Sequence, residues 1–243
     1  MYALFVKEIK GFLSSLIGYL VIAVFLLING LFLWVFRTDF NILDFGYADL
    51  SGLFYLAPFV FLFLVPAITM RSFADERKSG TIEMLLTKPL TDLQIIMAKY
   101  LASLAIVIFS LLPTLVYFYS IYQLGLPAGN LDAGGIWGSY IGLFFLGASF
   151  VAIGTFSSSI TDNQILSFIL AVMLSGFVYI GFEFINSLAW FGNIDLFIKQ
   201  LGIEAHYSSI SRGVIDTRDV IYFLSLIALF ISFTKLVIAS RKW

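Results

Sequence analysis

The stretch DERKSGTIEMLLTKPLTDLQ, residues 75–94, carries the densest group of charges in the chain. It lies between two long apolar runs, LFYLAPFVFLFLVPAITM (53–70) and YLASLAIVIFSLLPTLVYFYSIY (100–122). Crossing the hydrocarbon core of a bilayer takes about 20 mostly apolar residues, a length that these runs match. The charged stretch is therefore expected to connect two membrane-spanning helices.

The composition also requires a membrane. Of the 243 residues, 60% are hydrophobic and 12% charged, whereas a soluble domain carries about 25% charged residues. Spans this long must be helical to satisfy their backbone groups in lipid. We predict an all-α integral membrane protein, a single domain over residues 1–243, with six spans at about 16–36, 53–70, 100–122, 136–160, 164–184 and 220–240.

The basic residues predict the orientation of these spans. Ten of the 14 lysines and arginines fall on one side of the spans, near both termini and in residues 71–99, and four fall on the other side. Lysine and arginine accumulate on the cytoplasmic side of membrane proteins. We therefore expect both termini and the 71–99 loop to be cytoplasmic, in the cytoplasmic (inner) membrane.

Two further segments are neither spans nor simple loops. Residues 2–14 place apolar side chains on one helical stripe with charged side chains off it, which predicts an interfacial helix before the first span. Residues 185–219 include Trp190 and Phe191, and so long a structureless loop is uncommon. We expect short helices that lie on or dip into the outer leaflet; a periplasmic docking surface is the alternative.

Helix signals divide the charged stretch into two parts. Thr81 is a candidate N-cap with Glu83 in the first turn, where the helix dipole favours an acid. Pro89 is expected to stop this short helix. Thr91 and Gln94 have the spacing of a capping box, which predicts that a second helix begins there and continues into the third span.

The short helix is amphipathic. Ile82, Leu85 and Leu86 share a face, which either rests on lipid or fills the groove of a cytoplasmic partner. Gly80 permits a turn without a Cβ penalty. In the second interpretation, four charged residues at the rim set the register of docking: Asp75, Glu76, Arg77 and Lys78.

The longer stretch DERKSGTIEMLLTKPLTDLQIIMAKYLAS resembles the signature of ABC-2-type transporter permeases. In that family the loop is a coupling helix that docks in a cleft of the ATP-hydrolysing subunit. An interfacial helix, six spans and a membrane-dipping segment between the last two spans are also features of the family. The resemblance implies that the ATPase-coupling residues are Asp75, Glu76, Arg77, Lys78, Gly80, Thr81, Glu83, Leu86 and Pro89.

The resemblance also implies partners. The chain has no G-x-x-x-x-G-K-[ST] phosphate-binding loop, so we expect a separate ATPase subunit to bind ATP and no enzymatic activity or cofactor here. The family implies a second permease subunit, identical or different. KEIKGFLSSLIGYLVIAVFLLINGLFLWVF and HYSSISRGVIDTRDVIYFL resemble the permease of the gliding-motility-associated ABC transporter, which implies an accessory extracytoplasmic subunit. The transported substrate is not encoded in any recognisable motif.

Other candidate sites are few. Glu183 lies near the outer end of its span, and could line a pathway or gate because acids in spans are often functional; an ordinary helix end is the alternative. His206 is the only histidine and the chain has no cysteine, so we expect neither a metal site nor a catalytic set. The net charge of −1 argues against nucleic-acid binding. A secondary transporter or channel, or a structural anchor of a motility or secretion machine, are alternative functions.

Overall fold

The computed structural model describes the whole chain except residues 45, 88, 189–191, 193–194 and 241–243. The described part is helical and contains no strand. Its helices are α1 (Tyr2–Leu13), α2 (Leu16–Trp34), α3 (Ser51–Thr69), α4 (Ala74–Lys78), α5 (Thr81–Leu86), α6 (Asp92–Leu111), α7 (Leu115–Leu124), α8 (Ala133–Ile160), α9 (Gln164–Gly176), α10 (Phe182–Ser187), α11 (Asp195–Gln200), α12 (Ile203–Ile210) and α13 (Thr217–Ala239), with a 3-10 turn η1 (Leu112–Thr114) and a π-helical turn η2 (Phe177–Gly181).

Six helical stretches in the described residues are long and apolar enough to cross a membrane. This confirms the predicted number of spans. The third stretch begins earlier than expected, at Asp92, because the capping box of Thr91 and Gln94 forms as the sequence predicted. The stretches are Leu16–Trp34, Ser51–Lys78, Asp92–Leu124, Ala133–Ile160, Gln164–Ser187 and Thr217–Ala239.

Helix α8 is the centre of the bundle. It packs against α3, α6, α9, α12 and α13, and small residues allow these close approaches. A Cβ added at Gly138 would lie 2.7 Å from the Cα of Gly213, and one added at Gly147 would lie 2.8 Å from Val107. The Gly138 face of α8 therefore packs within this chain, against α12 and the turn after it.

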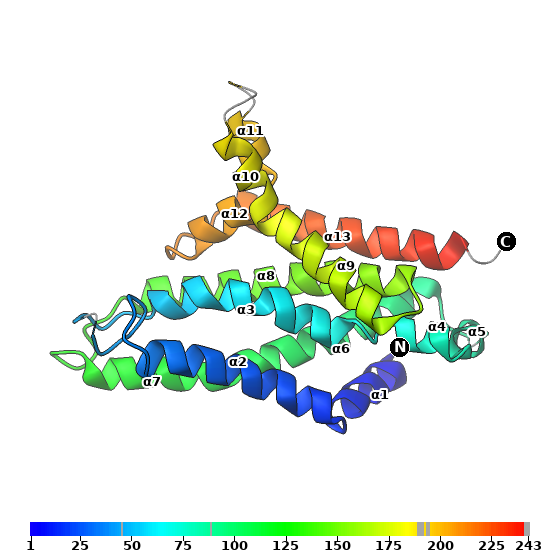
Figure 1. Ribbon diagram of the computed structural model, residues 1–243, viewed down its shortest axis with the longest axis horizontal. Coiled ribbons are helices and arrows are strands. Elements are labelled where there is room, and N and C mark those ends of the chain that lie inside the picture. The colour runs from blue at the N-terminus through cyan, green and yellow to red at the C-terminus, as the bar shows by residue number, and fades with distance from the viewer. Residues whose placement is uncertain (45, 88, 189–191, 193–194, 241–243) are drawn as a thin grey trace.

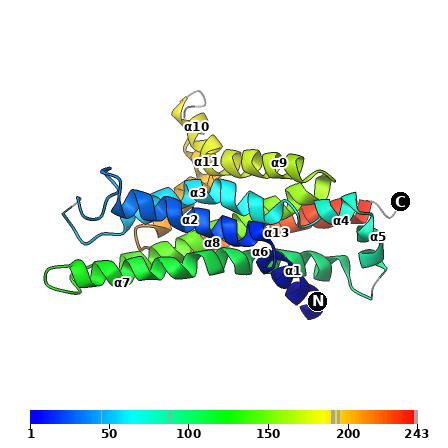
Figure 2. The ribbon, with the colours of Figure 1, turned by 60° about the horizontal axis from the view of Figure 1, so that its bottom comes forward.

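The two ends of the bundle differ (Figure 1). Helices α1, α4 and α5 and the C-terminal end of α13 lie at one end, here named the elbow end. The loop before α3 and the loop after α7 lie at the opposite end, in the turned view as well (Figure 2). Both described chain ends therefore lie on the same side as the charged stretch, as predicted. That this side is cytoplasmic stays a prediction.

The segment between the last two spans contains the short helices that the sequence predicted. Helices α10 and α11 project sideways from the bundle (Figure 1), and α12 packs on α8. The Tyr207 hydroxyl of α12 donates a buried hydrogen bond of 2.6 Å to the Phe54 carbonyl oxygen of α3. Trp190 and Phe191 lie outside the described residues, and the depth of this segment in a membrane stays a prediction.

Candidate functional site

The elbow, defined as residues 74–87, consists of α4, a turn and α5. Gly80 forms the turn with a φ of +70°, a left-handed conformation that favours glycine. A Cβ there would meet nothing within 4 Å, so the backbone angle alone explains the glycine. The prediction that Thr81 is the N-cap is wrong, because Gly80 occupies that position and Thr81 is the first helical residue. The Thr81 hydroxyl lies 2.9 Å from that of Ser79.

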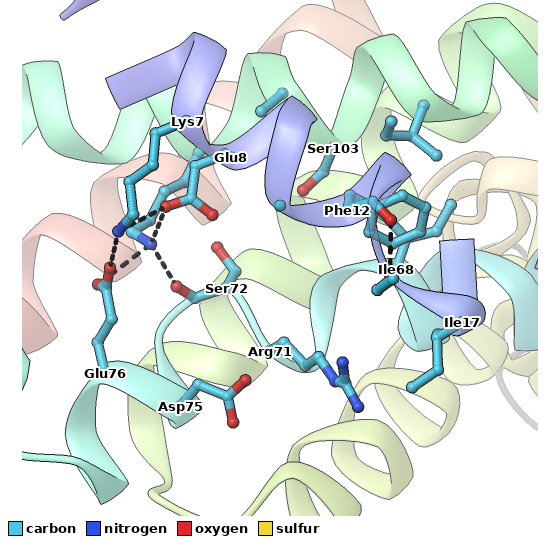
Figure 3. A pocket seen from close by; sticks show the side chains of 15 residues that line it. Lys7, Glu8, Phe12, Ile17, Ile68, Arg71, Ser72, Asp75, Glu76 and Ser103 are labelled. Atoms are coloured by element: carbon cyan, nitrogen blue, oxygen red, sulfur yellow. Dashed lines mark hydrogen bonds and ion pairs between the residues drawn. The ribbon is translucent and has the colours of Figure 1, made fainter. Parts of the chain in front are cut away.

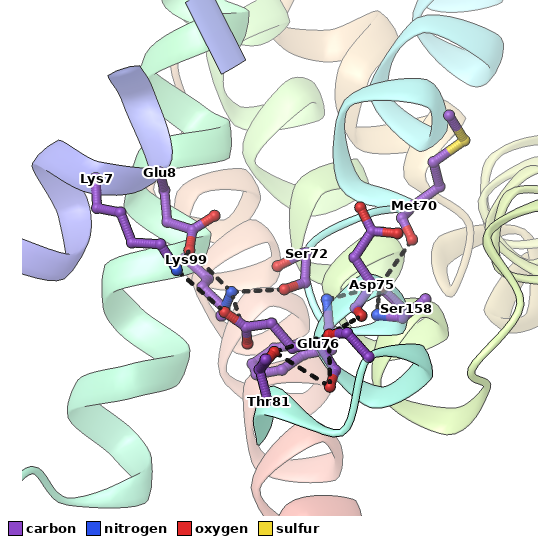
Figure 4. Close-up of polar contacts among 12 residues, drawn as sticks. Lys7, Glu8, Met70, Ser72, Asp75, Glu76, Thr81, Lys99 and Ser158 are labelled. Carbon is purple, nitrogen blue, oxygen red and sulfur yellow. Dashed lines mark hydrogen bonds and ion pairs between the residues drawn. The ribbon is translucent and has the colours of Figure 1, made fainter. Parts of the chain in front are cut away.

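Four side chains form a charge cluster behind the elbow (Figure 4): Lys7, Glu8, Glu76 and Lys99. The Lys99 ammonium lies 3.0 Å from a Glu8 carboxylate oxygen and 3.1 Å from one of Glu76. It also donates a 2.6 Å hydrogen bond to the Ser72 carbonyl oxygen. The Lys99 side chain is 1% exposed, so its charge is stabilised almost entirely by these protein groups.

The charge cluster joins three segments that are distant in the sequence. Glu8 belongs to α1, Glu76 to α4 and Lys99 to α6. The expectation that Glu76 lies at the rim of a docking surface is wrong, since its side chain is 13% exposed and points inward to Lys99. The sequence analysis did not single out Lys99, although a lysine in the apolar run that leads into a span is the kind of residue that is usually functional.

Helix α8 holds the start of the elbow through Ser158 (Figure 4). The Ser158 hydroxyl accepts hydrogen bonds from the backbone N–H groups of Phe73, at 3.0 Å, and Ala74, at 3.1 Å. It donates to the Met70 carbonyl oxygen at 3.0 Å. Ser158 thus caps α4 in the way an N-cap residue does, but from another helix. Asp75 adds a contact to α9 by accepting a hydrogen bond from the Gln164 side chain.

The apolar face of α5 packs inside the chain. Ile82 and Leu85 are buried in a cluster with Leu4, Phe73, Ile95, Ile96, Ala98 and Ile238. The hypothesis that this face fills a partner's groove is therefore wrong for these two residues. The side chain of Leu86 lies outside the described part.

The opposite face of the elbow is open. Lys78, Gly80, Thr81 and Glu83 are exposed, and Met84 is an apolar side chain that is 70% exposed. Pro89 is also exposed and follows the end of α5, in agreement with its predicted role as a helix stop. Arg77 is half-buried, with its Nε and Nη2 atoms lacking hydrogen-bond partners among the described residues. The surface that a partner can reach is therefore mostly polar, with Met84 as an exposed apolar side chain.

Glu183 lies in a different part of the molecule, on α10, away from the elbow (Figure 1). Its carboxylate forms a 3.0 Å ion pair with the Lys199 ammonium of α11. It lines a cavity of about 630 Å³ whose walls also include Tyr55, Tyr179 and Tyr207. The π-helical turn η2 directly precedes α10, and such turns occur frequently at functional sites. The sequence analysis did not predict this turn.

A polytopic helical membrane protein with a rigid polar elbow between its second and third spans is the class that this structure defines. The profile of the family described as "ABC-2 family transporter protein" matches residues 38–239, which run from before α3 to the end of α13. The chain belongs to this family, whose members are membrane components of ABC transporters that work with a separate ATPase. No individual curated protein matches the chain.

Proposed function

We propose that this chain is the permease subunit of an ABC transporter and couples ATP hydrolysis by a separate ATPase subunit to export across the cytoplasmic membrane. The elbow is the coupling segment. The observation that carries this proposal is that one face of the elbow is exposed while the other is fixed to the spans. A segment of this kind transmits a displacement, whereas a loosely attached loop would absorb it.

The attachments give the path of the displacement. The ion pair of Glu76 and Lys99 connects α4 to α6, and the Glu8 carboxylate connects the same ammonium to α1. Ser158 connects the start of α4 to α8, the centre of the bundle. A partner that pushes on the exposed face therefore acts at once on the first helix and on two central spans.

Further partners follow from the proposal. Two permease subunits, identical or different, enclose the pathway; α9 and α13 leave most of their surface uncovered, which supports contact with lipid or a second permease. Glu183 and its cavity form part of the pathway or its gate. The narrower resemblance adds a gliding-motility system with an accessory extracytoplasmic subunit.

The test is the ATPase activity of the transporter complex with Met84→Glu or Glu83→Arg in the exposed face of the elbow. Both variants are expected to retain the thermal stability of the wild-type permease and to lose transport-coupled hydrolysis by at least tenfold. Leu126→Glu is the matched control, because Leu126 is 93% exposed in the loop after α7, at the opposite end. Wild-type coupling in both elbow variants would contradict the proposal.

A further inference from the structure

A cavity of about 270 Å³ lies beside the charge cluster, between α1, the C-terminal end of α3 and the start of α6 (Figure 3). It is many times larger than the ~10–15 Å³ that one water molecule needs. Its walls are divided in character. Arg71, Ser72 and Asp75 contribute polar groups, whereas Ile17, Ile68 and Ile106 contribute apolar surface from the spans.

The charges in this cavity are not all neutralised by the protein. Lys99 is paired with Glu8 and Glu76. Arg71 forms no hydrogen bond or ion pair with any described residue, and its Nε atom is buried. Asp75 accepts a hydrogen bond from the neutral Gln164 amide but forms no ion pair, not even with Arg71 on the same wall.

A third polar group points to a missing ligand. Ser72 is 8% exposed, and its hydroxyl has no hydrogen-bond partner in the described part of the chain. Buried polar groups are paired in the great majority of cases, so an orphan beside an unpaired guanidinium needs an explanation. An anionic group bound between Arg71 and Ser72 would satisfy both.

We propose that this cavity binds the headgroup of an amine-bearing phospholipid from the leaflet at the elbow end. The phosphate contacts the Arg71 guanidinium, which suits phosphate because several N–H groups donate from one plane. The ammonium group contacts the Asp75 carboxylate. The apolar walls at Ile17, Ile68 and Ile106 receive the start of the acyl chains, which favours a lipid over a free phosphate compound.

This site is separate from the proposed function, because lipid binding requires neither ATP nor an ATPase. Its position matters nevertheless. Asp75 belongs to α4, and Arg71 and Ser72 directly precede that helix. A bound headgroup would therefore hold the elbow against α1 and the adjoining spans, in addition to the charge cluster.

The test measures lipid retained by the full-length chain. Purified, delipidated protein is mixed with vesicles of phosphatidylethanolamine or of phosphatidylglycerol, or with free phosphoethanolamine, then repurified and analysed by native mass spectrometry. Wild type is expected to retain phosphatidylethanolamine at least fivefold better than phosphatidylglycerol and not to bind free phosphoethanolamine. Arg71→Gln should reduce the retained phosphatidylethanolamine at least tenfold, and Asp75→Asn should abolish the preference between the two lipids. Arg37→Gln, at an exposed arginine far from the cavity, is the matched control.

A second measurement needs no variant and therefore covers the case in which Arg71→Gln fails to fold. Phosphatidylethanolamine with a photoreactive group on its headgroup should label the wild-type peptide that contains residues 71–76. Undiminished retention by a folded Arg71→Gln variant, equal retention of the two lipids by wild type, displacement of lipid by free phosphoethanolamine, or labelling only elsewhere would each overturn the proposal.

Discussion

Replacing Lys99 by methionine tests whether the charge cluster holds the elbow in place. The substitution keeps the length and apolar stem of the side chain but removes its charge. Three contacts of 2.6–3.1 Å are lost at once, to Ser72, Glu8 and Glu76. The cation–π contact with the Phe73 ring, whose centroid lies 5.2 Å from the ammonium, is lost too.

The cost follows from the burial of the groups left behind. Removing one partner of a fully buried ion pair costs about 3–5 kcal/mol, because an uncompensated charge remains. Here the Glu8 and Glu76 side chains are 24% and 13% exposed, so water stabilises them in part. We therefore expect the lower end, about 3 kcal/mol, which is roughly a 100-fold change in the folding equilibrium.

Lys7 provides the matched control. It belongs to the same charge cluster, but its side chain is 66% exposed and its ammonium lies 3.5 Å from Glu76 and 3.8 Å from Glu8. Exposed ion pairs contribute about 0–1 kcal/mol. Lys7→Met should therefore change the free energy of unfolding by under about 1 kcal/mol.

The assay is equilibrium unfolding of the full-length chain in mixed micelles with increasing denaturing detergent. A double-mutant cycle of Lys99→Met with Glu76→Gln isolates the pair itself, and we expect a coupling energy of about 1–3 kcal/mol. Equal, small effects of Lys99→Met and Lys7→Met, or a coupling energy near zero, would refute the view that Lys99 fixes the elbow.

Three further predictions concern single atoms. Ser158→Ala should cost about 1–2 kcal/mol and accelerate hydrogen exchange of the Phe73 and Ala74 amides, whereas Ser157→Ala, which loses only a bond within its own helix, should leave those amides protected; unchanged exchange in Ser158→Ala would argue against the cap. Gly80→Ala should cost about 1 kcal/mol through its positive φ alone, measured by the same unfolding assay, while Gly11→Ala in open space should be neutral or stabilising. Gly138→Ala should cost about 1–3 kcal/mol because its Cβ meets Gly213, and Gly134→Ala, whose Cβ would come only to 3.5 Å from Asp132, should cost clearly less; similar costs would indicate that α8 and the turn after α12 are not in close contact.

Much of the fold could be predicted because a membrane imposes simple rules. Length and hydropathy identify the six spans, and the capping box at Thr91 and Gln94 identifies the start of α6. Gly80 marked the turn in the elbow. These features depend on local sequence, which is why they were accessible without a structure.

The details of the elbow depend on contacts between distant segments and could not be read locally. The amphipathic pattern of α5 identified a buried face but not what covers it, and the cover is α1, α6 and α13. Glu76 looks like a surface charge until Lys99 and Glu8 are brought beside it. Ser158 caps a helix 84 residues away, a partner that no spacing rule reveals.

The most direct test of the account is site-specific cross-linking from the exposed face of the elbow. The chain has no cysteine, so Met84→Cys introduces a single reactive thiol without further changes. In native membranes a short thiol-reactive photo-cross-linker at this position should capture a nucleotide-hydrolysing protein, identified by its mass, and Leu126→Cys should not. Capture of that protein from position 126 and not from position 84, or labelling of the Met84→Cys thiol by an impermeant reagent added outside intact cells, would contradict the account.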